Sequence, residues 1–313
     1  MRILNYIIIA CLVLAAASCK KEAVLVASKQ TFGYTLPQGN HPYDKTITDF
    51  YNKYGVYMLY KFTDKDTYWT PTGWKNATLD ANGVGTTGYL ATPADTSNGD
   101  YISRQITVLN KLWFGFYTDK FLKQFLPTKI MLCSSVDSIY ATYIYSPVYR
   151  ILRNDAVVGA WANFDNINVN YGNAAVMNMT QTDSIKFAKK VNLIFAQSII
   201  TRNLAAPTAD FTAVTNYATY TSQATAYANG ILTTYYSSPT ALTDWSLYIQ
   251  AMVSCTEATL NKSRVNTDAS LVGILNPVKD TNGKIRQRYN IVRNYFINNY
   301  GVDLQAIGNY TGR

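Results

Sequence analysis

The chain has 313 residues, of which 48% are hydrophobic, and this length suits one large domain or two closely packed subdomains. Its formal charge of +9 comes from basic residues spread along the chain without a recognisable nucleic-acid-binding module, so we expect no nucleic-acid partner. The sequence contains one histidine, His41, and two glutamates, Glu22 and Glu257, which excludes an H-E-x-x-H zinc motif anywhere in it.

The N-terminus is similar to a bacterial lipoprotein leader. A short basic start and an apolar run precede small residues at 15–18 and then Cys19. This pattern predicts a secretory signal peptide over residues 1–18, because the apolar run is too short to span a membrane. Cys19 is the expected lipidation site. Cys11 is a rival site, although it would leave an apolar region of only about half the minimum length.

Residues 19–40 are expected to form a lipid-anchored tether for a single domain at 41–313. The stretch KKE at 20–22 resembles the charged segment that sends some Bacteroidetes lipoproteins to the outer face of the outer membrane. The expected location is therefore the outer membrane, facing the cell surface. The other two cysteines, Cys133 and Cys255, lie in apolar segments, where they could pair or remain buried thiols.

The first half of the domain mixes helices and strands. Apolar residues at helical spacing and a closing glycine predict a helix at 44–55. An aromatic-rich loop is expected at 64–74, a long loop at 80–99 and a long helix at 100–126. Strands are predicted at 56–62, 129–135, 148–152, 157–164 and 166–170.

A long helix in the stretch 180–207 is the central feature of the sequence. Thr180 and Asp183 fit the [ST]-x-x-[DE] pattern of a capped start, and a proline closes the stretch. Only three residues between 191 and 200 are polar, so the helix is expected to be buried. A turn is expected at 280–283, and further helices are predicted at 210–217, 222–236, 243–259, 268–275 and 284–300.

This order of elements indicates an α+β fold. We expect an N-terminal mixed α/β subdomain with a small sheet at 41–207, which includes the central buried helix. A C-terminal helical subdomain should follow at 208–313. A local basic cluster on the last long helix is interpreted as a solvated helix face, and its members are Lys284, Arg286, Arg288 and Arg293.

Several segments resemble the substrate import-associated zinc metallohydrolase lipoproteins of Bacteroidetes. They are FYNKYGVYMLYKFTDKDTYWTPTGW at 50–74, FLKQFLPTKIMLCSSV at 121–136, the central helix, and NYGVDLQ at 299–305. This resemblance implies a zincin-like fold and an association with nutrient import through SusC/SusD-type systems. The family's central helix carries H-E-F-A-H. Here Phe195 and Ala196 match the middle pair.

The resemblance also implies that the zinc site is degenerate. Two imidazoles one helical turn apart can reach one metal ion, but Leu193 and Gln197 hold these positions, and Ile194 replaces the catalytic glutamate. The third, acidic ligand corresponds to Leu247 if Asp244 aligns with the family's acidic segment. We therefore expect no metal, no cofactor and no metallohydrolase activity. Apolar residues at three of these positions predict a filled former cleft.

The sequence leaves three functions open. The first is a non-catalytic accessory subunit of a SusC/SusD-like TonB-dependent importer of peptides or glycans, with the SusC-like transporter and SusD-like lipoprotein as partners. The second is a stand-alone glycan- or peptide-binding lipoprotein. The third is a glycan hydrolase that uses aspartates such as Asp64 and Asp66. Tyr68, Trp69 and Trp74 are the candidate ligand-binding residues, because aromatic rings stack on sugars and anchor peptides.

Overall fold

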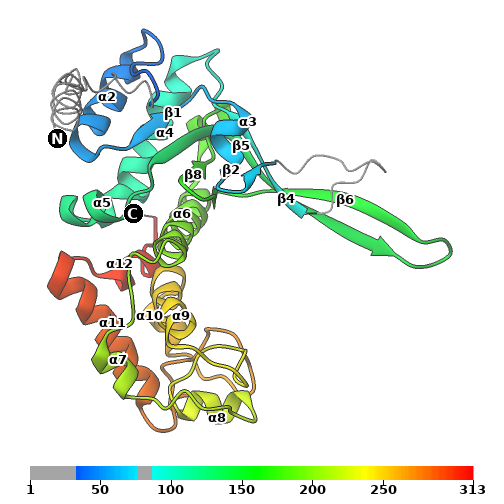
Figure 1. The fold of residues 1–313 in the computed structure, drawn as a ribbon, viewed down its shortest axis with the longest axis vertical. Helices are drawn as coiled ribbons and strands as arrows, with labels where there is room; N and C mark the ends of the chain where they lie inside the picture. Colours follow the sequence, from blue (N-terminus) through cyan, green and yellow to red (C-terminus); the bar gives the residue numbers. More distant parts are fainter. Residues whose placement is uncertain (1–32, 76–86, 313) are drawn as a thin grey trace, which may run out of the picture. The chain divides into compact units, whose positions relative to one another are not determined.

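The computed structural model describes residues 33–75 and 87–312 (Figure 1). The chain divides into two compact units, Met1–Thr35 and Leu36–Arg313. The predicted signal peptide, Cys19 and the charged stretch at 20–22 lie outside the described residues. Among the described residues, no helix is both long enough and apolar enough to cross a membrane.

A small mixed sheet is built around strand β5 (Lys129–Ile144). The first part of β5 pairs in parallel with β1 (Tyr57–Leu59) and with β8 (Asn166–Val169), and β7 (Ala160–Ala162) adds an antiparallel edge to β8. The run from Ile130 to Cys133 is fully buried. A continuous apolar run of this kind is typical of strands covered on both faces.

The second part of β5 leaves this buried layer. There it pairs antiparallel with β4 (Thr87–Pro93) and with β6 (Arg150–Val157), and the β5–β6 hairpin extends beyond β4 (Figure 1). The predicted loop at 80–99 is therefore wrong over 87–93, and the predicted strand at 129–135 is too short. The residues that pair with β4 lie 40 to 53 positions further along the chain, which local sequence patterns cannot reveal.

Two predictions about the N-terminal elements differ from the structure. The helix expected at 100–126 is interrupted, because Thr118 starts a new helix by accepting a hydrogen bond from the backbone N–H of Phe121 (3.3 Å). The loop expected at 64–74 contains a short helix and a two-stranded hairpin. The elements are α2 (Pro42–Tyr54), α3 (Asp64–Tyr68), β2 (Trp69–Thr70), β3 (Gly73–Trp74), α4 (Gly99–Leu112), η1 (Phe114–Phe116) and α5 (Asp119–Phe125).

The central helix is confirmed as α6 (Gln181–Thr201). Thr180 and Asp183 form the predicted capping box: each side chain accepts a hydrogen bond from the other residue's backbone N–H at 3.1 Å. Phe187, Val191 and Phe195 are among its buried residues. The helix packs against β7, β8 and the C-terminal helix α9 (Ala241–Ser254), which places it between the sheet and the helical part of the unit.

The C-terminal part is helical, as predicted. The helix expected at 284–300 is confirmed, whereas residues 268–275 form turns and bends. The helix expected at 243–259 breaks at Cys255, which with Cys133 is a free thiol. The remaining elements are η2 (Ala174–Asn178), α7 (Ala209–Ala213), α8 (Gln223–Ala228), α10 (Glu257–Leu260), α11 (Lys284–Tyr300) and α12 (Leu304–Gly308).

One member of the basic cluster on α11 is not solvated. Arg288 is fully buried and forms an ion pair with Asp244 of α9, which is also fully buried. The guanidinium lies 3.7 Å from the ring centre of Phe211 and near the rings of Tyr217 and Tyr248. The interpretation of the cluster as a solvated face is therefore wrong at Arg288, because charge alone does not reveal a buried partner.

Candidate ligand-binding cleft

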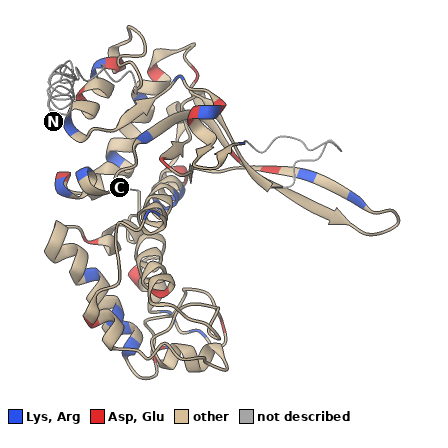
Figure 2. Ribbon diagram, viewed as in Figure 1, with Lys and Arg blue, Asp and Glu red and all other residues tan. Residues whose placement is uncertain are grey.

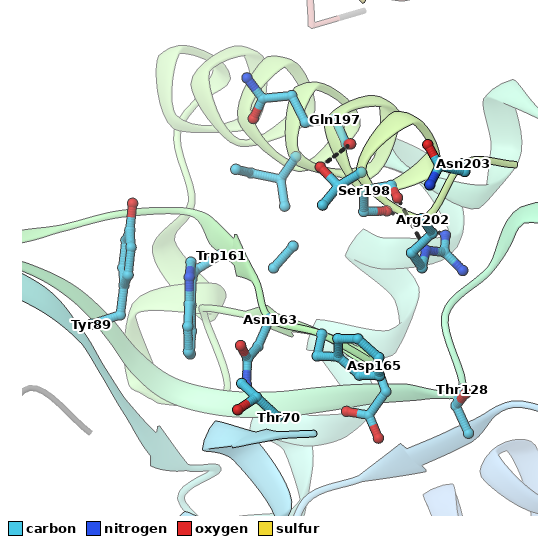
Figure 3. A pocket seen from close by; sticks show the side chains of 14 residues that line it. Thr70, Tyr89, Thr128, Trp161, Asn163, Asp165, Gln197, Ser198, Arg202 and Asn203 are labelled. Atoms are coloured by element: carbon cyan, nitrogen blue, oxygen red, sulfur yellow. Dashed lines mark hydrogen bonds between the residues drawn. The ribbon is translucent and has the colours of Figure 1, made fainter. Parts of the chain in front are cut away.

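A cleft of about 870 Å³ lies between α6 and the edge of the sheet (Figure 3). We call it the helix cleft. The expectation of a filled cleft is therefore wrong. The helix ends beside an open space instead of packing its whole length against the sheet. The lining residues are Thr70, Tyr89, Thr128, Trp161, Ala162, Asn163, Phe164, Asp165, Ile194, Gln197, Ser198, Thr201, Arg202 and Asn203.

Aromatic rings form one wall of the helix cleft. Trp161 on β7 and Tyr89 on β4 stack with ring centres 4.8 Å apart and an interplanar angle of 12° (Figure 3). Tyr68 also packs on Trp161, with ring centres 5.7 Å apart. Alternation along β7 buries Ala160 and turns Trp161 to the opposite face. The wall gives a flat apolar surface, of the kind that contacts sugar rings or apolar side chains.

The lining next to the aromatic wall is polar. Asn163 donates hydrogen bonds to the backbone oxygens of Thr67 (2.9 Å) and Trp69 (3.0 Å), which fixes the β2–β3 hairpin beside the cleft. Asp165 forms an ion pair with the buried ammonium of Lys129 at 3.0 Å. Within the described residues that line this cleft, Asp165 is the one carboxylate.

Arg202 places a positive charge at the end of α6. Its guanidinium donates to the backbone oxygens of Leu126 (3.1 Å), Phe125 and Ser198 (3.1 Å), so it satisfies carbonyl groups at the ends of two helices. Desolvation by burial lowers the pKa of Arg202 to about 10, which leaves it charged at neutral pH. With Asp165 it makes the lining mixed in charge.

The side chains at the positions that the sequence resemblance singles out do not fit a metal ion. Ile194 and Gln197 line the helix cleft, whereas Leu193 and the more distant Leu247 pack half-buried against the hydrophobic core. Leucine and isoleucine have no ligand atom, and the side-chain amide of Gln197 donates to Gln250 at 3.1 Å. Over residues 33–75 and 87–312, no group of three potential metal ligands lies close enough to hold an ion.

Two of the three predicted aromatic residues lie at a second, smaller hollow of about 390 Å³, which shares Thr70, Trp161 and Asn163 with the helix cleft. Tyr68 and Trp74 line it. Tyr68 is buried, its hydroxyl accepts a hydrogen bond from the backbone N–H of Ala91 (2.8 Å), and burial raises its pKa to about 12. Trp74 is 53% exposed.

The third predicted aromatic residue, Trp69, does not line either hollow. It packs edge-to-face on Phe164 with ring centres 5.4 Å apart, and Phe164 lines the helix cleft. The structure thus brings Tyr68 and Trp74 to the second hollow. Trp161, which lines both hollows, and Tyr89, which lines the helix cleft, were not predicted. Alternation in the predicted strand 157–164 could have identified Trp161; Tyr89 lay in a predicted loop.

The aspartates considered for glycan hydrolysis support local structure. Asp66 caps α3, because its carboxylate accepts hydrogen bonds from the backbone N–H and the hydroxyl of Thr63, both at 2.7 Å. Asp64 lies in the first turn of the same helix. Neither residue lines the helix cleft or the second hollow.

A solved structure is similar to this chain over most of its length. The crystal structure of a "putative zinc-binding metallo-peptidase" from Bacteroides caccae is similar to this chain over 85% of this chain and 88% of that chain, with a TM-score of 0.45 and 12% sequence identity. Neither a protein-family model nor a curated protein matches the chain.

Proposed function

We propose that this chain is a non-catalytic lipoprotein that binds a peptide or glycan nutrient in the helix cleft. In this proposal Cys19 anchors it to the outer membrane, facing the cell surface. It acts there as an accessory subunit of a SusC/SusD-like importer, and its zincin-like fold derives from the metallohydrolase lipoproteins that its sequence resembles. The observation that carries the proposal is an open cleft whose helix presents Ile194 and Gln197 where that family places a catalytic glutamate and a histidine.

The chemistry of the lining supports binding over hydrolysis. The stacked rings of Tyr89 and Trp161 offer apolar contact, and the side-chain oxygen of Asn163 and the amide group of Asn203 offer polar contact. A two-carboxylate mechanism needs a second acid about 5–10 Å from the first. Asp165 has no such partner among the described lining residues, and its ion pair with Lys129 favours a structural role.

Purification of the tagged protein from outer membranes in mild detergent tests the proposal. We expect a TonB-dependent transporter and its SusD-like lipoprotein to copurify in stoichiometric amounts. The matched control is the Cys19→Ser variant, which lacks the acyl anchor and should no longer copurify with the partners. If the tagged protein purifies without partners at several detergent concentrations, the result would favour a stand-alone binding protein instead.

A second assay separates binding from catalysis. Peptides and oligosaccharides are incubated with the purified chain and analysed by mass spectrometry for cleavage products. The proposal predicts none above the level of a heat-denatured control. Product formation that is lost in Asp165→Asn would favour the aspartate-dependent hydrolase.

A further inference from the structure

The β5–β6 hairpin exposes apolar side chains around its tip. We define the hairpin tip as residues 145–149, between the end of β5 and the start of β6 (Figure 1). Tyr145 is 77% exposed, Val148 65% and Tyr149 55%. Tyr145 and Tyr149 lie with ring centres 5.8 Å apart. Scattered exposed apolar residues are normal on a protein surface, but a cluster at the end of a projecting hairpin indicates an interaction site.

The apolar exposure continues on both faces of the hairpin. Thr142 pairs with Leu152 and Tyr143 pairs with Ile151, and successive residues of a strand point to opposite faces. Leu152 is therefore exposed on one face and Tyr143 on the other. A protein partner usually covers a single face of a hairpin. A fluid lipid interface surrounds an inserted tip on every side.

The charges behind the tip have one sign. Between residues 138 and 154 the charged residues are Arg150 and Arg153, which stand on opposite faces because they are three positions apart in the strand. Asp137 and Asp155 lie nearer the base, and in Figure 2 the outer part of the hairpin ribbon carries blue, basic positions and the part nearer the base carries red, acidic ones. An apolar tip followed by cations is complementary to an anionic bilayer surface.

We propose that the hairpin tip inserts into the interfacial region of an anionic lipid surface. Tyr145, Val148 and Tyr149 enter the boundary between headgroups and acyl chains, where tyrosine is favoured, while Arg150 and Arg153 contact the anionic headgroups. Among the described strands, β6 pairs with β5 alone, so its outer edge has no further strand beside it; only the tip enters, and the strands do not span the bilayer. This contact is independent of the ligand cleft.

Vesicle flotation tests this inference with residues 19–313 carrying Cys19→Ser, so that neither the apolar run of the predicted signal peptide nor an acyl chain contributes. The probes are phosphatidylcholine vesicles with and without phosphatidylglycerol. The triple variant Tyr145→Ser/Val148→Ser/Tyr149→Ser should lower partitioning by about tenfold, since buried apolar area drives interfacial binding. Arg150→Gln should lower it by about fivefold on anionic vesicles alone, and added salt should remove that difference.

The matched control is Tyr235→Ser, which removes an equally exposed tyrosine (77%) from another region. It should partition like the parent chain, and circular dichroism should confirm that all variants fold. Equal flotation of the triple variant and its parent would overturn the inference. A concentration-dependent dimer that requires the tip residues, with flotation unaffected by them, would also overturn it and assign the tip to a second copy of the chain.

Discussion

Polar side chains are buried and paired in the helical part, whereas in the helix cleft they line open space. In the helical part Asp244 and Arg288 are fully buried and bonded to each other, and the carboxylate of Asp244 also accepts from the backbone N–H of Leu232 (2.6 Å). In the cleft, Gln197 and Asn163 line open space. The first arrangement uses charge to fix the packing of α9 against α11, and the second leaves polar groups beside a space that a ligand can enter.

The difference explains why a substitution at the cleft wall can change the site without disturbing the fold. Removing one member of a buried ion pair leaves a charge without a partner, which is costly. Replacing a group at the cleft wall leaves water in its place, which costs much less. The cleft residues can therefore change function while the helical part keeps the structure.

The largest expected effect is on stability, at the buried ion pair. Arg288→Met should lower the free energy of unfolding by about 3–5 kcal/mol, because Asp244 would remain buried without its cation. Urea denaturation measures this as a lower midpoint with an unchanged slope. The double variant Asp244→Leu/Arg288→Met should recover part of the loss. A single variant as stable as the parent would contradict the account of the pair.

A smaller effect is expected on ligand binding, at the aromatic wall. Trp161→Ala should weaken binding of peptide or glycan by about 2 kcal/mol, since large aromatic residues carry much of the energy of such contacts. Isothermal titration calorimetry measures the change. The matched control is Trp74→Ala, at the second hollow, which should change affinity less. Equal losses in both variants would move the site to the second hollow.

Stability should also fall at high pH. Burial raises the pKa of Tyr68 to about 12, above the unfolded value of about 10, so its contribution is complete below pH 10 and is lost as pH rises towards 12. Urea midpoints measured from pH 9 to pH 12 test this. In Tyr68→Phe the decline should be less steep. An identical slope would assign the alkaline sensitivity to other tyrosines.

The smallest effect is expected at Gln197. Its amide donates to Gln250 in a half-buried contact, so Gln197→Ala should lower stability by about 1 kcal/mol or less. Thermal unfolding measures this, with Gln250→Ala as the reciprocal variant. A loss as large as that of Arg288→Met would mean that the cleft wall supports the fold in the same way as the helical part.

The fold was predictable where local chemistry decides the structure. The capping pair Thr180 and Asp183 and the apolar run that follows identified α6, and the glycine at 55 ends α2 in a left-handed conformation (φ 72°). The strand β4 and the break before Thr118 were missed, because long-range pairing and a second capping site override the local pattern.

The cleft could not be predicted from the sequence because its parts are distant along the chain. Tyr89 and Trp161 are separated by a long stretch that includes two helices and β5, and only the pairing of the sheet stacks their rings. The sequence identified Ile194 and Gln197 as positions of interest but predicted a filled space around them. Whether space remains between a helix and a sheet edge depends on how both pack against the rest of the unit.

The most direct test of the central claim is recovery of an intact ligand from the helix cleft. The purified chain and its Trp161→Ala variant are each incubated with a casein digest and with mixed oligosaccharides, separated from unbound material by gel filtration, and analysed by mass spectrometry. We predict that the parent chain retains an uncleaved peptide or oligosaccharide and that the variant retains much less. Cleaved products in the bound fraction, or equal retention by the two proteins, would contradict the account.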